Sequence, residues 1–533
     1  MGQINVIGVE YALSDGRVLL NDVSFRVGDG AKVALIGANG VGKTTLFRMI
    51  AGDLQPDEGQ IIVTGGLGIM RQFIGSIRDE STVRDLLISV SPEKIRNAAE
   101  KLKVAERALE EKNEEREQLA YAEALAEWGD AGGYDQEVLW DMAASKALGK
   151  TFDRVANREV NSLSGGEQKR LVLELLLIGP EEVLILDEPD NYLDVPAKRW
   201  LEEEIRKSKK TVLFISHDRE LLAATATKIV TLEQGVNGNT AWIHGEGFDT
   251  WHEARRVRNE QFAQLLERWE DEHRRLKDLV LTLQWQAASS QDMASRYRAM
   301  QTRLRKFEEI GPPPPPPRVQ DVKVNLRSTR TGERVVTCED LTIENLTEPF
   351  TIEIYYQDRV AILGKNGTGK SHFLRMVSGD TTVRFNGTFK LGARVKPGFF
   401  AQTHAHPEFE GKTLLEILWE QNSLQLGAAK SVLGRYELAD HAEQKFTSLS
   451  GGQQARFQVL LLELAGDTLL LLDEPTDNLD LASAEALERA LDAYQGTVIA
   501  VTHDRWFARG FTRFMIFGSE GQVYESPEPV WSH

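Results

Sequence analysis

Six short runs along the chain are continuously apolar, which is typical of strands buried on both faces of a parallel sheet. They are residues 33–36, 183–186, 212–215, 360–363, 469–472 and 498–501. The last three runs repeat the order of the first three, and the polar motifs around them recur at matching distances. The pattern therefore predicts two α/β domains in tandem.

A helix-forming stretch interrupts the first repeat. At about residues 91–146, leucine and alanine recur at helical spacing among Glu, Lys and Arg. This predicts a helical hairpin that projects from the first domain. A solvated surface helix pair without a partner is the alternative.

A second helical stretch joins the two domains. Its apolar stripe has a period near 3.5 residues and is broken at residues 286–292, which predicts two long antiparallel helices. About 30 residues in each helix would make a rod of roughly 45 Å. Prolines at 312–317 would form a stiff spacer after it. The expected boundaries are 1–249 for the first domain, 250–320 for the linker and 321–533 for the second domain.

Composition and charge restrict the class of protein. Of 533 residues, 41% are hydrophobic and 27% charged, as in ordinary globular proteins. The absence of a long apolar run and of a signal-peptide pattern predicts a cytoplasmic protein without a membrane segment. The single cysteine, Cys338, excludes an internal disulfide and is expected to be buried. The net charge of −18 argues against DNA as a partner.

Each domain carries a glycine-rich loop directly after a predicted strand. In such a loop, successive backbone N–H groups surround phosphates, and the next helix N-terminus adds partial positive charge. The lysine contacts the β- and γ-phosphates, and the hydroxyl residue after it, Thr44 or Ser371, binds Mg²⁺. The expected ATP ligands are Gly37, Asn39, Gly40, Gly42, Lys43, Thr44 and Thr45, and Gly364, Asn366, Gly367, Gly369, Lys370 and Ser371.

A predicted buried strand in each domain ends in Asp-Glu-Pro. The Asp is suited to hold Mg²⁺ through water, and the Glu is placed to polarise the attacking water. A histidine lies 30 residues after each Asp, where it can donate to the γ-phosphate. These candidate metal-binding and catalytic residues are Asp187, Glu188 and His217 in the first domain and Asp473, Glu474 and His503 in the second.

The return helix of the linker is basic although the chain is acidic. Bases spaced along one helix can neutralise phosphates, so RNA contact is expected here. In the alternative interpretation, these bases face solvent or pair with acids of the first linker helix. The candidate RNA-binding residues are Arg296, Arg298, Arg303, Arg305 and Lys306.

A Leu-Ser-Gly-Gly sequence begins 24 residues before each Asp-Glu-Pro, at Leu163 and Leu449. With the loops above, these motifs resemble the ATP-binding cassette (ABC) superfamily over nearly the whole chain. The resemblance implies two P-loop ABC ATPase domains that hydrolyse ATP with Mg²⁺. It also implies that the two cassettes pair head to tail within a monomer.

The resemblance also assigns residues. Gln72 and Gln402 match the Q-loop glutamines, His217 and His503 match the switch histidines, and residues 191–194 and 478–480 match the D-loops. Tyr11 is expected to stack on adenine in the first site. Each site is completed by the signature of the other cassette, which is Ser450, Gly451, Gly452 and Gln453 for the first site and Ser164, Gly165, Gly166 and Glu167 for the second.

Some positions depart from the family pattern. The first signature ends in Glu167 instead of Gln, and Tyr192 and Asn478 replace a frequent His in the D-loops. The second half has no evident aromatic counterpart of Tyr11. Both Asp-Glu pairs are present, so neither site is expected to be inactive.

The tandem cassettes, the arm and the helical linker resemble the ABC-F subfamily. This resemblance implies binding at the ribosomal E site, with the linker hairpin directed toward the P-site tRNA and the peptidyl-transferase centre. The expected partners are therefore the ribosome, its rRNA and tRNA. Antibiotic resistance by ribosome protection remains open, as does an ATP-binding subunit for a separate membrane transporter.

Overall fold

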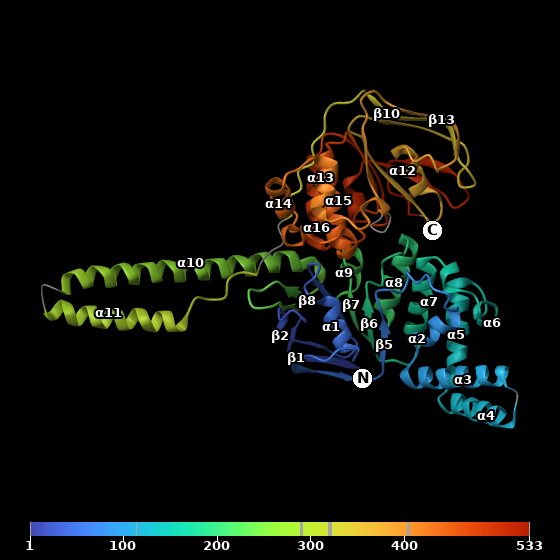
Figure 1. Ribbon diagram of the computed structural model, residues 1–533, viewed down its shortest axis with the longest axis horizontal. Coiled ribbons are helices and arrows are strands. Elements are labelled where there is room, and N and C mark those ends of the chain that lie inside the picture. Colours follow the sequence, from blue (N-terminus) through green and yellow to red (C-terminus); the bar gives the residue numbers. More distant parts are fainter. Residues whose placement is uncertain (1, 113, 288–290, 318–321, 402–405, 532–533) are drawn as a thin grey trace.

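Two domains of the same architecture lie one above the other in Figure 1. The computed structural model describes residues 2–112, 114–287, 291–317, 322–401 and 406–531. The first domain has strands β1 (Gln3–Ala12), β2 (Val18–Val27), β3 (Lys32–Gly37), β4 (Glu58–Thr64), β5 (Leu67–Met70), β6 (Val183–Asp187), β7 (Thr211–Ile215), β8 (Lys228–Glu233) and β9 (Thr240–His244). The second has β10 (Arg334–Ile343), β11 (Phe350–Tyr355), β12 (Arg359–Gly364), β13 (Phe385–Leu391), β14 (Pro397–Phe400), β15 (Leu469–Asp473), β16 (Thr497–Val501), β17 (Arg513–Phe517) and β18 (Val523–Ser526).

The two domains share one sheet topology. A six-stranded sheet runs β5-β6-β7-β3-β8-β9 in the first domain and β14-β15-β16-β12-β17-β18 in the second. The strands pair in parallel except the last, which is antiparallel to its neighbour. A three-stranded antiparallel sheet accompanies each, β2-β1-β4 or β11-β10-β13. The predicted α/β fold with two tandem cassettes is confirmed.

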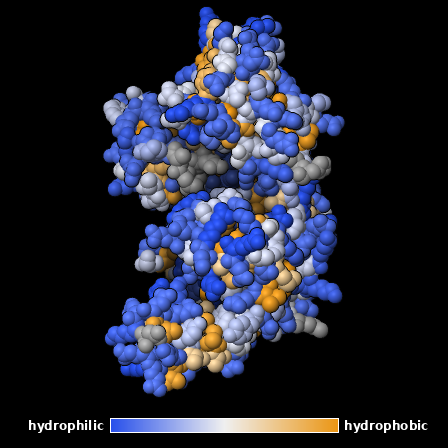
Figure 2. All heavy atoms as spheres, turned by 90° about the vertical axis from the view of Figure 1, so that its right-hand side faces the viewer, coloured by the Kyte–Doolittle hydropathy of each residue, from blue (hydrophilic) through white to orange (hydrophobic). Residues whose placement is uncertain are grey.

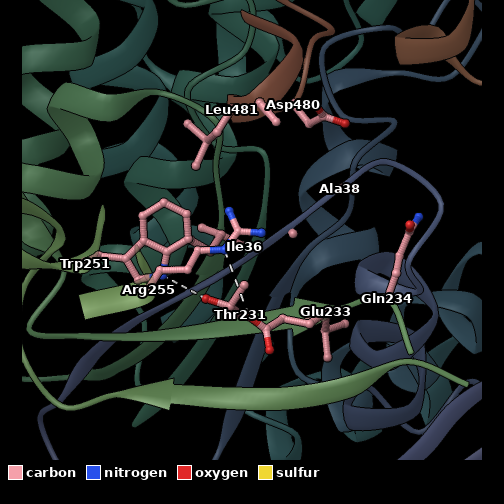
Figure 3. A pocket seen from close by; sticks show the side chains of 12 residues that line it. Ile36, Ala38, Thr231, Glu233, Gln234, Trp251, Arg255, Asp480 and Leu481 are labelled. Carbon is pink, nitrogen blue, oxygen red and sulfur yellow. Dashed lines mark hydrogen bonds and ion pairs between the residues drawn. The ribbon is translucent and has the colours of Figure 1, made fainter. Parts of the chain in front are cut away.

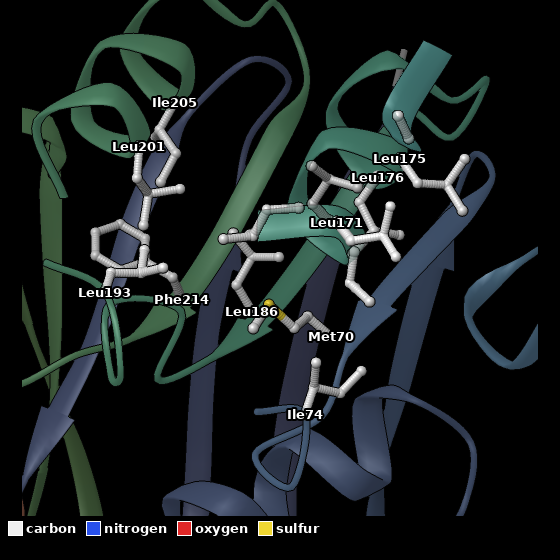
Figure 4. Close-up of a cluster of buried hydrophobic side chains, with 14 of the residues drawn as sticks. Met70, Ile74, Leu171, Leu175, Leu176, Leu186, Leu193, Leu201, Ile205 and Phe214 are labelled. Carbon is white, nitrogen blue, oxygen red and sulfur yellow. The ribbon is translucent and has the colours of Figure 1, made fainter. Parts of the chain in front are cut away.

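The central strands are buried because helices cover both faces of the six-stranded sheet. In the first cassette, helices α7 (Gly165–Ile178) and α8 (Val195–Lys207) place leucine and isoleucine side chains on β6 and β7, as Figure 4 shows. Complete burial of one such side chain contributes about 2 kcal/mol. The opposite face packs against α1 (Lys43–Ile50) and the small sheet. This packing leaves the carboxyl ends of β3 and β6 at one edge, where the loop and the Asp-Glu-Pro lie.

The insert of the first cassette contains more than one hairpin. It follows α2 (Val83–Val90) and forms α3 (Glu93–Glu111), α4 (Glu115–Asp130) and α5 (Gly133–Leu148). Helices α3 and α4 pack on each other and project at the lower right of Figure 1. Helix α5 instead packs against α7 and buries Trp140. The projecting pair is therefore shorter than the expected range of 91–146.

The linker forms two helices of unequal length, which project on the other side of the first cassette (Figure 1). Helix α10 (Phe248–Ala287) has 40 residues, and α11 (Gln291–Ile310) has 20. The longer helix spans about 60 Å, which exceeds the 45 Å expected from equal helices. Trp269 stacks on Phe307 at 5.2 Å between ring centroids, so these aromatic side chains form the contact between the two helices. Part of the expected tip, residues 288–290, lies outside the described residues.

The surface seen in Figure 2 is largely hydrophilic. On the face seen in Figure 2, hydrophobic side chains occur in small patches among hydrophilic ones. Among the helices of the described ranges, none combines the length and apolar character needed to cross a membrane.

Candidate active sites

The two glycine-rich loops adopt backbone conformations that require glycine. Gly37 and Gly364 have φ of 152° and 150°. A Cβ on Gly37 would lie 2.5 Å from the carbonyl oxygen of Leu232, and one on Gly364 would lie 2.3 Å from that of Phe517. Any larger residue would therefore push the loop away from the neighbouring strand.

The lysines of both loops are buried and held by their own loop. Lys43 Nζ donates to the carbonyl oxygens of Gly37 and Ala38 at 2.7 and 3.1 Å. Lys370 Nζ makes the same pair of bonds in its own loop at 2.8 and 2.7 Å. Burial lowers the pKa of both lysines, and nearby carboxylates oppose this effect. The two ammonium groups thus start from equivalent positions at the phosphate-binding end of α1 and of α12 (Lys370–Ser378).

A hydroxyl and a carboxylate come together beside each lysine. Ser371 Oγ donates to Asp473 Oδ1 at 3.1 Å, and the Thr44 hydroxyl lies near enough to Asp187 to act against the rise in its pKa. Burial raises the pKa of Asp187 to about 7 and also raises that of Asp473. Among the described residues, Asp187 Oδ1 is buried without a hydrogen-bond partner. One carboxylate and one hydroxyl with an unused buried oxygen fit Mg²⁺, which takes few protein ligands beside phosphates and water.

The two catalytic candidates share a strained backbone. Glu188 and Glu474 have φ of 50° and 47°, a left-handed conformation that is uncommon outside glycine and costs of order 1–3 kcal/mol. This conformation turns each chain sharply after β6 or β15. Each carboxylate also lies near the lysine of its own loop, where its charge acts against the lowering of that lysine's pKa by burial.

The surroundings of the two glutamates differ. Glu188 Oε2 accepts from Gln72 Nε2 at 3.1 Å and from Asn191 Nδ2 at 2.7 Å. Glu474 is buried, and its Oε2 accepts from the backbone N–H of His503 at 3.0 Å. Burial, followed by the nearby Asp477, raises the pKa of Glu474 to about 8. The second Q-loop residue, Gln402, lies outside the described residues.

Both switch-histidine candidates lie at the site, shielded from solvent and close to the lysine of their own loop. Burial lowers the pKa of His217 to about 4 and that of His503 well below its usual value. Within the described residues, neither ring nitrogen of His217 has a hydrogen-bond partner. A neutral imidazole keeps one N–H to donate to a phosphate oxygen.

The cassettes face each other head to tail. Asn39 of the first loop donates from its backbone N–H to Asp480 Oδ2 at 3.0 Å and from Nδ2 to the carbonyl of Asn478 at 3.3 Å. Asn366 of the second loop donates to the carbonyl of Tyr192 at 3.2 Å. Each glycine-rich loop thus touches the D-loop of the opposite cassette.

The signatures complete this arrangement. Ser164 caps α7, and Ser450 caps α15 (Gly451–Ala465), each through a capping box with Glu167 or Gln453. A Cβ on Gly452 would lie 1.8 Å from Asn39 Nδ2, so this signature glycine lies against the loop of the first cassette. The helix N-terminus that follows adds partial positive charge where phosphates would bind. The remaining signature residues of the prediction, Gly165, Gly166 and Gly451, occupy the first turns of the same two helices.

A cleft of about 730 Å³ opens between the cassettes beside the first loop. Its lining includes residues 17–19, 39–40, 234–236 and 238–239 of the first cassette, and His441, Gln453 and Arg456 of the second. Tyr11, which was expected to stack on adenine, packs against the core of its own cassette and is not among the described residues that line the cleft. Thr45 lies in the first turn of α1.

Sequence reasoning missed the ion pairs that join the cassettes. Arg219 donates to Glu488 at 3.0 Å, and Arg505 donates to Glu202 at 3.4 Å. Both arginines lie two residues after the histidine of their cassette, and both glutamates lie 15 residues after the Asp of Asp-Glu-Pro. This matched spacing was the available signal, because a repeated contact needs repeated residues.

The root of the linker rod also contacts the interface. Trp251 of α10 donates to Thr231 Oγ1 at 2.9 Å, and Arg255 lies over its ring at 5.1 Å. Figure 3 shows both side chains in a small cavity that Asp480 and Leu481 of the second cassette close from above. The D-loop of the second cassette thus contacts the first glycine-rich loop and, through Asp480, lines the cavity at the root of the rod.

The candidate RNA-binding residues are all exposed on α11. Arg296 pairs with Asp292 at 3.2 Å and Arg305 with Glu309 at 3.6 Å within the helix. Arg303 reaches Glu272 of α10 at 3.5 Å. Of these three pairs, only that of Arg303 is with an acid of the first linker helix, so the alternative interpretation applies to one of the five bases. Exposed pairs of this kind are weak, so the side chains stay available to a stronger partner.

Comparison with known proteins identifies relatives over the whole chain. The family described as ABC transporter matches residues 20–191 and 347–477. An "Antibiotic resistance protein" of Mycobacteroides abscessus is 56% identical over the full length of both chains. "ABC transporter F family member 2" of Arabidopsis thaliana is 31% identical, covering 96% of this chain and 76% of that protein. "Energy-dependent translational throttle protein EttA" of Haemophilus influenzae is 29% identical, covering 95% and 90%.

A solved structure supports the arrangement of the domains. The archaeal ribosome recycling factor aABCE1, in complex with a ribosomal stalk protein, matches with a TM-score of 0.56 at 19% identity, covering 97% of this chain and 89% of that chain. At this identity the similarity concerns the fold alone. It shows the same succession of two nucleotide-binding cassettes.

Proposed function

Because the chain belongs to the ABC-F subfamily of ATP-binding cassette proteins, we propose that ATP hydrolysis between its cassettes controls its binding to the ribosome. The cassettes bind and hydrolyse ATP, as in the family. A relative named as a translational throttle and the exposed basic helix α11 support the ribosome as the partner. Such a role would place the protein in the cytoplasm, acting as a monomer on rRNA and tRNA.

The chemistry follows from the site. Lys43 and Lys370 hold the β- and γ-phosphates, and the opposite signature helix binds the γ-phosphate from the other side. Mg²⁺ held by the Thr44–Asp187 or Ser371–Asp473 pair would neutralise phosphate charge. Glu188 and Glu474 then orient the attacking water, and neutral His217 and His503 donate to the γ-phosphate.

One observation carries the mechanical part of the proposal. Asp480 accepts a hydrogen bond from Asn39 of the first loop and, with Leu481, lines the same cavity as Trp251 and Arg255 at the root of α10. Closing the first site therefore fixes the angle of the rod relative to the second cassette. ATP favours this closed state only through its higher affinity for it, and hydrolysis removes that advantage. The rod, directed toward the P-site tRNA and the peptidyl-transferase centre, would be withdrawn when the cassettes open.

The test uses the double variant Glu188→Gln/Glu474→Gln. It should keep ATP bound, trap the closed state and raise the fraction that co-sediments with purified bacterial ribosomes at least tenfold over the wild-type protein with ADP. The control is the same variant with two further changes, Lys43→Ala and Lys370→Ala, which make it unable to bind ATP. If the trapped variant sediments with ribosomes no better than this control, the proposed function is wrong.

Ribosome protection is a second candidate function. The relative that is 56% identical over its full length is named an antibiotic resistance protein. Expression of this chain would then raise the inhibitory concentration of antibiotics that act on the large ribosomal subunit, and the double Glu→Gln variant would not. Unchanged inhibitory concentrations together with ribosome binding would favour a role in translation itself.

A further inference from the structure

The two active sites differ at several positions after the catalytic glutamate, and one of them changes a hydrogen-bond donor beside it. Asn191 lies three residues after Glu188, and Asp477 lies three residues after Glu474. Both positions follow matching strands, β6 and β15, at the same distance. An amide can donate a hydrogen bond to a carboxylate, whereas an ionised carboxylate only accepts. The second glutamate therefore lacks, at this position, the hydrogen-bond donor that the first glutamate has.

In the first site, two amides hold the glutamate. Asn191 Nδ2 donates to Glu188 Oε2 at 2.7 Å, and Gln72 Nε2 donates to the same oxygen at 3.1 Å. Both bonds end on Oε2, and neither uses Oε1. Two donors that reach one oxygen from different loops restrict the rotation of the carboxylate and leave the other oxygen to orient water.

In the second site, the glutamate lies differently. Glu474 Oε2 accepts from the backbone N–H of His503 at 3.0 Å, and its Oε1 lies 3.6 Å from His503 Nε2. Only 8% of Glu474 is exposed. Asp477 lies near Lys198 of the first cassette, whose charge acts against the rise in the pKa of Asp477 caused by burial, and an ionised Asp477 has no hydrogen to donate to the glutamate. The second carboxylate is thus turned toward its own histidine.

We propose that Asn191 is a positioning residue that orients Glu188 for attack by water, and that Asp477 deprives Glu474 of this donor, so that the first site hydrolyses ATP faster than the second. The inference rests on the catalytic roles proposed above for the two glutamates. Under this proposal the two sites act in sequence. The second site retains its nucleotide and keeps the cassettes aligned, while the first site hydrolyses ATP next to the root of α10. The timing of rod movement would then be set by the first site.

The experiment measures single-turnover phosphate release from ATP and Mg²⁺ in the absence of ribosomes. Each site is isolated by a Glu→Gln change in the other one. In the Glu474→Gln background, Asn191→Asp should lower the rate of the first site about tenfold without changing ATP affinity, because Asn191 acts on the carboxylate and not on the nucleotide. In the Glu188→Gln background, Asp477→Asn should raise the rate of the second site several-fold.

Two further variants separate positioning from a merely structural role. Asn191→Gln keeps an amide and should recover part of the lost rate, whereas Asn191→Leu should not. Asn157→Asp, an exposed change of the same chemistry outside the sites, is the matched control and should leave the rate unchanged.

Equal rates in the two Glu→Gln backgrounds would overturn the proposal. An effect of Asn191→Asp on ATP affinity alone would overturn it as well. Because the assay contains no ribosomes, these outcomes are independent of the co-sedimentation test, and failure of that test would leave the inequality of the sites standing.

Discussion

Two of the ion pairs that join the two cassettes repeat each other, whereas the Arg509–Glu220 pair and the buried charges between the cassettes have no counterpart among the described residues. Arg219–Glu488 and Arg505–Glu202 are the same contact made twice, once from each cassette. Lys198, in contrast, is buried on α8 at 3.0 Å from Asp218, and the matching position of α16 (Leu481–Ala493) is Ala484.

This difference shows how a repeated chain obtains two unequal sites. The repeated pairs align the cassettes about an approximate two-fold axis, so both loops meet a signature. A difference at a single matching position, such as Lys198 in the first cassette and Ala484 in the second, then affects one half of the interface only. Because Lys198 interacts with Asp190 of its own cassette and with Asp477 of the other, it also links the two active sites electrostatically.

The largest expected effect comes from changing the lysine of either glycine-rich loop, which tests whether the two sites are unequal. Lys43→Ala and Lys370→Ala should each reduce hydrolysis at their own site by about 10²–10³-fold, because each removes a buried charged donor to the phosphates. Total steady-state ATPase should fall much further with Lys43→Ala, since the first site is proposed to be the faster one. Phosphate release assays check both variants.

The control for the loops is Lys209→Ala, which removes an exposed lysine of the first cassette and should have no effect. Equal losses of steady-state ATPase in the two loop variants would mean that the two sites hydrolyse ATP at the same rate. The two sites would then differ in structure but not in their rate of hydrolysis.

A smaller effect should appear at the buried lysine. Lys198→Met leaves Asp218 and its neighbouring carboxylates without their cation, which costs about 3–5 kcal/mol for a buried pair. The midpoint of urea unfolding should fall, and ATP-dependent closure, followed by fluorescence transfer between labels on the two cassettes, should weaken.

Lys207→Ala is the matched control for this variant. Lys207 pairs with Glu203 on the same helix, and both side chains are exposed, so its loss should leave the unfolding midpoint unchanged. If Lys198→Met behaves like Lys207→Ala, the buried charges do not stabilise the closed pair.

The fold was predictable because its signals are local. Runs such as residues 183–186 and 469–472 are apolar at every position, and the glycines of the loops have conformations that other residues adopt only with strain. The arm was less predictable at its boundary. Helices α3, α4 and α5 all have helix-forming sequences, and only the burial of Trp140 against α7 shows that α5 belongs to the cassette.

The site was predictable in its residue types and only partly in its geometry. The loop, the Asp-Glu-Pro and the histidine lie together at the carboxyl edge of each sheet, as their spacing indicated. Tyr11 packs against the core of its own cassette and is not among the described residues that line the cleft, and its stacking on adenine stays a prediction. The partner of Arg219 lies 269 residues away in the chain, and only the matched spacing of the two repeats, not any local pattern, indicates this contact.

By itself, the sequence determined the two cassettes, their chemical groups and the family, because strand burial, phosphate loops and acidic motifs depend on a few neighbouring residues. Only the tertiary structure decided which groups meet across the interface and how the two glutamates are held. The reason is physical: a hydrogen bond such as that from Asn191 to Glu188 depends on side-chain direction, and packing of the whole interface sets that direction.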